Sequence, residues 1–135
     1  MHRMALAVVL LLLAGCGSPA GPWHGRDLDE TDPAWQSLGL EPRMGLELDF
    51  LREEGAELAW DWFIDERQEV HFNAHTHDDA GVTDFEDLEA TDHKDTLVVP
   101  HDGVYSLVWI NTSQETLTLW HRTGQELQSS QTFFL

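Results

Sequence analysis

The chain reads V-H-F-N-A-H-T-H over residues 70–77. Successive side chains of a β-strand point to opposite faces, so this pattern separates apolar residues from histidines. The face that begins at Val70 carries Phe72, Ala74 and Thr76, and can pack into a core. The other face carries His71, Asn73, His75 and His77. We therefore expect a central strand with one buried face and one face lined by imidazoles.

Strand-like patterns continue on both sides of this segment, and almost no helical period occurs. An acidic stretch, residues 78–95, interrupts them and contains a short strand candidate near its middle. The expected strands cover residues 45–50, 58–64, 70–77, 82–90, 96–100, 104–110, 116–122 and 125–135. Seven or eight short strands with frequent turn signals predict an all-β fold, an antiparallel β-sandwich. A β-meander barrel is the alternative architecture.

Two local expectations concern neighbours of the histidine segment. The turn residues 65–68, D-E-R-Q, predict a hairpin in which strand 58–64 pairs directly with strand 70–77. Residues 23–40 are acidic and lack sustained periodicity, which indicates an extended lead-in with one helical turn at residues 33–37. The folded domain is therefore expected over residues 41–135.

The N-terminus has the pattern of a targeting segment. Arg3 precedes an apolar run, residues 5–14, which is about half of the ~20 residues needed to span a bilayer and fits a signal peptide. The run closes in L-A-G-C, which resembles a bacterial lipobox. That resemblance implies a signal peptide over residues 1–15, a diacylated Cys16, and a flexible acidic tether over residues 16–40. Because Gly17 follows the cysteine, we expect a periplasm-facing lipoprotein of the outer membrane.

Charge and cysteine content limit the partners. The chain has 25 acidic and 7 basic residues and a net charge of −18, so nucleic acid and electrostatic binding to anionic lipid are disfavoured, while cations are favoured. Solubility alone also explains such a balance. Cys16 is the only cysteine. If it carries lipid, no thiol remains for a disulfide, a nucleophile or a thiolate metal site.

The imidazole-bearing face predicts a site for a divalent transition metal, copper or zinc. His75 and His77 stand at i and i+2 on one strand face and can share an ion. Asn73 is expected to orient a neighbouring histidine by hydrogen bonding instead of binding the metal. Further ligand candidates are His71, His93, His101 and Asp78. The alternatives are surface histidines without a role and a pH-sensing patch.

Three motifs follow one another along the chain: L-x-W-x-W from residue 58, V-x-F-N-x-H-x-H from residue 70 and, after the acidic stretch, V-x-x-x-G-x-Y-x-L-x-W-x-N from residue 99. This arrangement resembles GOLD-like (emp24-type) β-sandwich modules over residues 45–123. The resemblance implies a non-catalytic binding domain, and hence the alternative function of a protein-interaction module with incidental histidines. The paired cysteines and transmembrane helix of cargo receptors of that group are missing from this sequence. No G-x-S-x-G, H-E-x-x-H or phosphate-binding glycine loop occurs, so we expect no enzyme. The matching positions are Leu58, Trp60, Trp62, Val70, Phe72, Asn73, His75, His77, Val99, Gly103, Tyr105, Leu107, Trp109 and Asn111.

Overall fold

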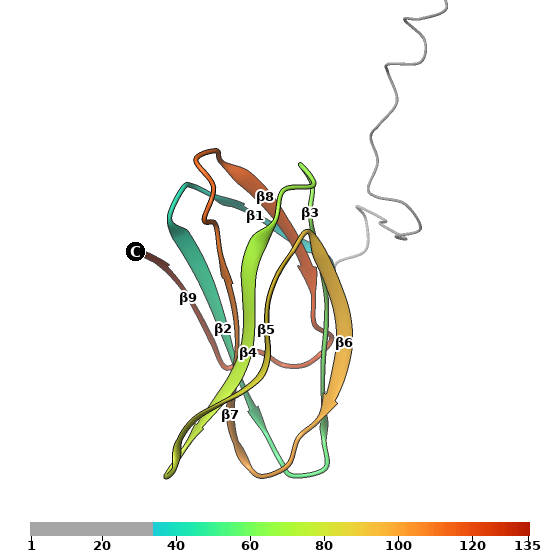
Figure 1. Ribbon diagram of the computed structural model, residues 1–135. Coiled ribbons are helices and arrows are strands. Elements are labelled where there is room, and N and C mark those ends of the chain that lie inside the picture. Colours follow the sequence, from blue (N-terminus) through green and yellow to red (C-terminus); the bar gives the residue numbers. More distant parts are fainter. Residues whose placement is uncertain (1–33) are drawn as a thin grey trace, which may run out of the picture.

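The computed structural model describes residues 34–135 as nine strands (Figure 1). The signal peptide, the lipobox with Cys16 and most of the tether lie outside the described residues. Within residues 34–135 no helix is long and apolar enough to cross a membrane. The strands are β1 (Gln36–Leu40), β2 (Met44–Arg52), β3 (Glu57–Ile64), β4 (Val70–Asp78), β5 (Gly81–Ala90), β6 (Asp92–Val98), β7 (Gly103–Ile110), β8 (Leu117–Arg122) and β9 (Ser129–Phe134).

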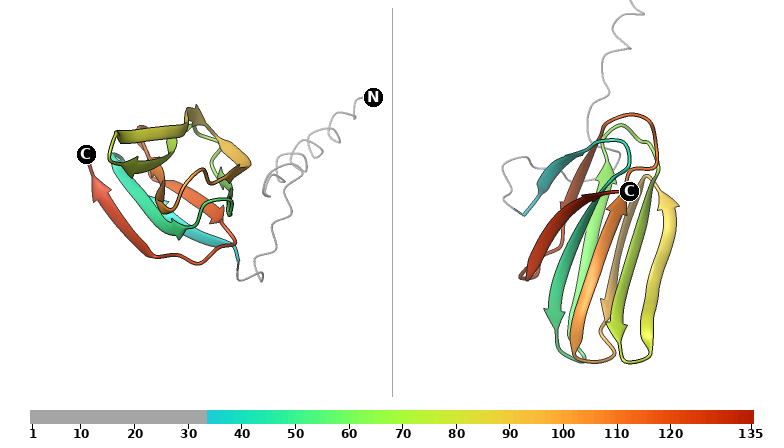
Figure 2. Two further views of the ribbon diagram at one scale, coloured as in Figure 1. Left: turned by 90° about the horizontal axis from the view of Figure 1, so that it is seen from below. Right: turned by 90° about the vertical axis from the view of Figure 1, so that its left-hand side faces the viewer.

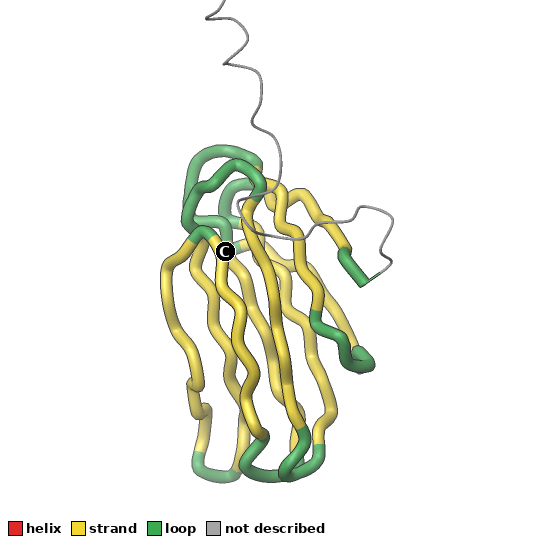
Figure 3. Tube along the Cα trace, turned by 90° about the vertical axis from the view of Figure 1, so that its right-hand side faces the viewer, coloured by secondary structure: helices red, strands yellow, loops and turns green. Residues whose placement is uncertain are grey.

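The strands form two antiparallel sheets that pack face to face, so the predicted β-sandwich is confirmed (Figures 2 and 3). The four-stranded sheet has the order β1-β8-β3-β6, and the five-stranded sheet has the order β5-β4-β7-β2-β9. Alternating apolar residues from both sheets meet in one core, as the period of a strand requires. The Phe72 ring lies 5.2 Å from that of Trp62 and 5.4 Å from that of Trp109.

The expected hairpin between strands 58–64 and 70–77 is wrong. β3 pairs with β6 and β8, whereas β4 pairs with β5 and β7 in the other sheet. Residues 65–69 therefore cross between the layers, and Arg67 adopts a positive φ of 60° there. Glu66 fastens the crossing to β8, because its carboxylate accepts hydrogen bonds from the Thr118 amide at 2.7 Å and hydroxyl at 3.0 Å. The two strands face each other across the core instead of lying side by side.

The folded part starts before residue 41. β1 pairs with β8 along its whole length, and Leu40 is fully buried in the core. The described part of the expected helical turn at residues 33–37 contains the start of this strand instead. A strand forms here instead of a helical turn because Leu38 and Leu40 alternate with exposed residues and so complete the inner face of an edge strand.

The acidic segment is more regular than expected. It forms β5 and the first part of β6. The sequence predicted the strand that corresponds to β6 at residues 96–100, whereas β6 begins at Asp92. A bulge interrupts the pairing of β5 with β4: Ala74 faces Glu86, His75 faces Asp84, and Phe85 is the extra residue. Beyond this bulge the alternation of β5 shifts by one residue. As a result Glu86 belongs to the inner face, while Asp84 belongs to the outer face.

Candidate metal site

The outer face of the five-stranded sheet carries the predicted histidine row on β4. His71, Asn73 and His75 are half-buried and His77 is exposed, while the residues between them are buried. Carboxylates border the row on both sides. Those on β5 pair directly with β4 residues, and those on β2 lie across β7. They are Asp84, Asp87 and Glu89 on β5, and Glu47 and Asp49 on β2.

His75 and His77 lie side by side, as their spacing predicts. Their ring centroids are 5.0 Å apart, with an angle of 80° between the planes. Asn73 fixes the orientation of the first ring, because its Oδ1 lies 2.6 Å from His75 Nδ1. The amide nitrogen of Asn73 donates to Asp84 at 3.0 Å and to Asp87 at 3.2 Å. The oxygen of Asn73 must therefore accept a proton from His75 Nδ1, which leaves the lone pair on Nε2.

Burial keeps the His75 ring neutral. It lowers the pKa of His75 below its ordinary value of 6.5, and the neighbouring His77 lowers it further, against the opposite effect of Glu47, Asp84 and Asp49. Two hydrogen bonds hold Asp49 in place. Asp49 accepts from Ser106 at 2.6 Å and from Ser129 at 3.0 Å. A neutral imidazole with a directed lone pair in a negative field is suited to a cation.

His71 does not join this pair. Its Nε2 lies 2.8 Å from Asp87 and its Nδ1 lies 2.9 Å from Glu89, so carboxylates hold both ring nitrogens. A ring nitrogen that binds a metal cannot also donate to a carboxylate, so metal binding by His71 would cost at least one of these two contacts. His71 therefore serves as a link between β4 and β5.

The structure brings His101 and Asp78 together in a separate place, where the loop before β7 meets the end of β4. His101 Nε2 lies 3.7 Å from Asp78, and its Nδ1 lies 3.0 Å from the carbonyl oxygen of Asp102. The hydroxyl of Tyr105 donates to the His101 carbonyl oxygen at 2.7 Å. This pair has two potential ligands, and no third one from residues 34–135 lies within ligand distance of it.

A group of three potential ligands, which the sequence did not predict, lies between the sheets at the β5/β6 edge. Ligand atoms of Glu86, His93 and Asp95 all lie within 4.8 Å of one another. The indole nitrogen of Trp60 donates to His93 Nδ1 at 2.8 Å, so a neutral His93 carries its own proton on Nε2. While this bond persists, His93 can donate to a carboxylate but cannot bind a metal through Nε2. The bulge at Phe85 turns Glu86 inward, and no sequence signal marks that bulge.

His121 also lies apart from the histidine row. It belongs to the inner face of β8, is 7% exposed, and has its ring centroid 5.6 Å from that of Trp109. Burial lowers its pKa to about 4. It therefore adds nothing to a site on the outer face.

A scan against protein-family models and a search of curated proteins found no match to this chain. The likeness to GOLD-like modules thus stays a prediction from short motifs. What the protein binds has to be inferred from its own side chains.

Proposed function

We propose that the protein is a non-catalytic, membrane-anchored lipoprotein whose β-sandwich binds a divalent transition metal, copper or zinc, through His75 and His77. One observation carries the proposal. Asn73 holds the His75 ring so that its Nε2 lone pair is available, and the His77 ring lies 5.0 Å away between centroids. Imidazole nitrogen is a preferred donor for Cu²⁺ and Zn²⁺.

The coordination would be open. Within residues 34–135 no carboxylate or further histidine completes a group of three ligands with this pair. Water would fill the remaining positions, and the surrounding carboxylates would attract the ion without binding it directly. Such a site fits reversible binding of a metal in passage better than a permanent structural metal, which is usually held by four protein ligands.

Calorimetric titration of the purified protein with Cu²⁺ and with Zn²⁺ tests the proposal. We expect a Kd of about 10 μM or tighter for at least one of them. The double variant His75→Ala, His77→Ala should weaken binding about 100-fold, because both ligands are lost. The matched variant His71→Ala, His101→Ala also removes two histidines, neither of them in the His75–His77 pair, and should keep the affinity. Equal losses in the two double variants would contradict the assignment.

The anchor is a separate part of the proposal and is supported by the lipobox-like sequence at residues 13–16. In bacteria grown with labelled palmitate, the protein should become labelled and fractionate with the outer membrane. The variant Cys16→Ser should lose the label and enter the soluble periplasmic fraction. Labelling that survives this substitution would exclude Cys16 as the lipid site.

A second candidate function, recognition of a protein partner, is favoured by exposed apolar side chains of the five-stranded sheet. Val82 pairs with His77 and is 58% exposed, and Leu51 pairs with Val104 and is 64% exposed. A photo-crosslinking residue at position 51 should give one defined protein adduct in cells. The same residue at position 114, in the loop after β7, should give none.

A further inference from the structure

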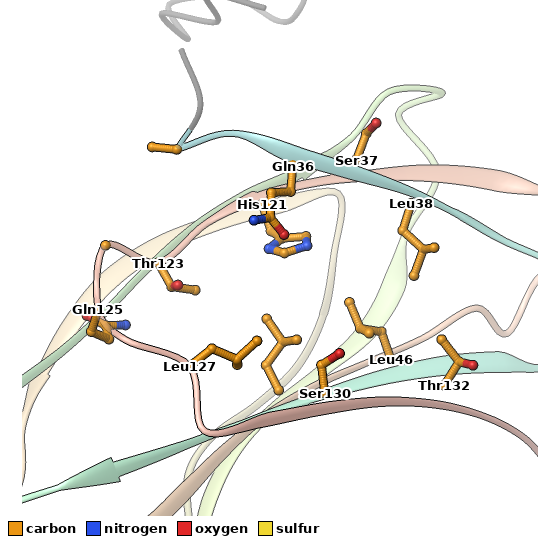
Figure 4. A pocket seen from close by; sticks show the side chains of 13 residues that line it. Gln36, Ser37, Leu38, Leu46, His121, Thr123, Gln125, Leu127, Ser130 and Thr132 are labelled. Atoms are coloured by element: carbon orange, nitrogen blue, oxygen red, sulfur yellow. The ribbon is translucent and has the colours of Figure 1, made fainter.

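The sandwich is hollow at the edge opposite β5 and β6. A cavity of about 450 Å³ lies between β1 and β8 of one sheet and β2 and β9 of the other (Figure 4). Its volume is in the range of pockets that take small organic molecules. The loop from β8 to β9 forms one side of the cavity with Thr123, Gln125 and Leu127.

The register of β9 explains the cavity. Ser130 and Thr132 pair with Leu48 and Leu46 of β2, so small polar residues occupy the inner face where a core strand would carry large apolar ones. β9 is nevertheless fastened on its outer face. The ring of Phe133 covers Gly45, where any side chain would collide with it. The edge strand therefore closes the sheet without filling the space behind it.

The described part of the lining has no formal charge. None of the described residues that line the cavity is Asp, Glu, Lys or Arg, in a chain of which 24% is charged. Leu38, Leu46, Leu48 and Leu127 supply apolar walls, and hydroxyl and amide groups surround them. A charged ligand would lose its hydration without gaining a partner of opposite charge, which is costly.

Among the described residues of this lining, His121 is the one ionisable side chain, and its ring points into the cavity (Figure 4). It is 7% exposed, and neither ring nitrogen has a hydrogen-bond partner among residues 34–135. The ring nitrogens are not fully enclosed by protein atoms, so they are open to a hydrogen-bond partner in the cavity. Burial lowers its pKa to about 4, so at neutral pH it offers one donor and one acceptor without charge.

We propose that this cavity binds an uncharged small molecule with an apolar body and one hydroxyl or carbonyl group, which hydrogen-bonds to His121. The apolar body lies against the four leucines, and the polar group forms a hydrogen bond with the imidazole. This site shares no residue with the outer-face histidines, so its ligand binding can be tested separately from metal binding.

Octan-1-ol, octanoate and octylammonium provide matched probes, because they share the chain and differ in charge. We expect octan-1-ol to shift the NMR signals of the His121 ring and of the Leu46 and Leu48 methyl groups in the full-length protein. The signals of His75 and His77 should stay unchanged. Octanoate and octylammonium should bind about tenfold more weakly or worse, because the cavity offers no counter-charge.

Two substitutions locate the ligand. Ser130→Phe places a ring in the cavity and should abolish octan-1-ol binding, whereas Ser129→Phe, on the outer face of the same strand, should leave it intact. His121→Leu keeps an apolar wall but removes the hydrogen bond, and should weaken octan-1-ol binding about tenfold. Circular dichroism checks that each variant folds, and if Ser130→Phe does not, His121→Leu and the charge series decide.

Three results would overturn the proposal. They are the absence of shifts at His121 with octan-1-ol, equal binding of the charged and uncharged probes, and unchanged octan-1-ol binding in His121→Leu.

Discussion

Two histidines of this molecule, His75 and His121, lie in surroundings of opposite character. His75 lies on the outer face of the five-stranded sheet, beside His77 and between carboxylates on β2 and β5. His121 lies between the sheets, where the described lining of the cavity carries no charge. Burial lowers the pKa of both rings, so both are neutral at neutral pH.

In our two proposals the surroundings of the imidazole, not the ring itself, select the ligand. On the outer face a fixed tautomer and a negative field favour a cation. In the cavity, apolar walls and the lack of counter-charge favour an uncharged molecule. If both proposals hold, one small fold carries two sites of opposite character, one on its outer face and one between its sheets.

The largest effect should come from placing a carboxylate in each environment. His121→Asp puts a negative charge among leucines and should lower the free energy of unfolding by about 3 kcal/mol at neutral pH. His75→Asp, on the solvated face, should cost about 1 kcal/mol through repulsion by neighbouring carboxylates. Urea unfolding followed by tryptophan fluorescence measures both values. Equal costs would mean that the cavity is as well hydrated as the surface.

Acid should weaken the protein through His121. Its pKa is about 4 in the folded state and 6.5 in the unfolded state, so the unfolded chain takes up the proton first as pH falls. The stabilisation is complete above the unfolded value and is lost as pH falls toward the folded one. Between about pH 7 and pH 5 this loss amounts to about 2 kcal/mol.

The variant His121→Gln lacks this titration but retains every other histidine. Between about pH 7 and pH 5 its free energy of unfolding should therefore fall by about 2 kcal/mol less than that of the wild type. Parallel curves for the wild type and the variant would show that the ring gains a proton without a penalty.

Asn73 should matter to the outer site alone. Without the Asn73 side-chain oxygen, the His75 ring loses its fixed tautomer. Asn73→Ala should therefore weaken metal binding about tenfold, as removal of an orienting partner usually does. Calorimetry with Cu²⁺ measures the change. His101→Ala, which removes the partner of Asp78, is the control and should bind as the wild type does.

The smallest effect is expected at His71. It links β4 to Asp87 and Glu89 on a partly solvated face, so His71→Ala should cost about 0.5 kcal/mol of unfolding free energy. Neither the metal affinity nor octan-1-ol binding should change. A large drop in metal affinity would place His71 among the ligands and reverse our assignment.

The sequence predicts the faces of β4 correctly because an alternation of two is a direct consequence of strand geometry. The pairing of β3 was predicted wrongly, because the sequence around it does not decide between two connections. A five-residue connection fits a hairpin within one sheet and a crossing between sheets equally well. The choice depends on contacts of Glu66 with β8, which lies about 50 residues further along the chain.

The ligand groups were harder to predict than the fold. His75, His77 and the orienting role of Asn73 follow from local spacing. The group around His93 depends on a one-residue bulge, and a single-residue shift exchanges the two faces of a strand. The cavity around His121 depends on the register of β9, which turns Ser130 and Thr132 inward. Neither feature leaves a mark in the alternation of residues.

The position of strand β5 also affects how copies of the protein meet one another. It is an unpaired edge of the five-stranded sheet, and such an edge is a template on which a second copy can add a strand. Four carboxylates, Asp84, Glu86, Asp87 and Glu89, stand along it. Two such edges repel each other, so the acidity of this strand should hinder pairing of two copies along it.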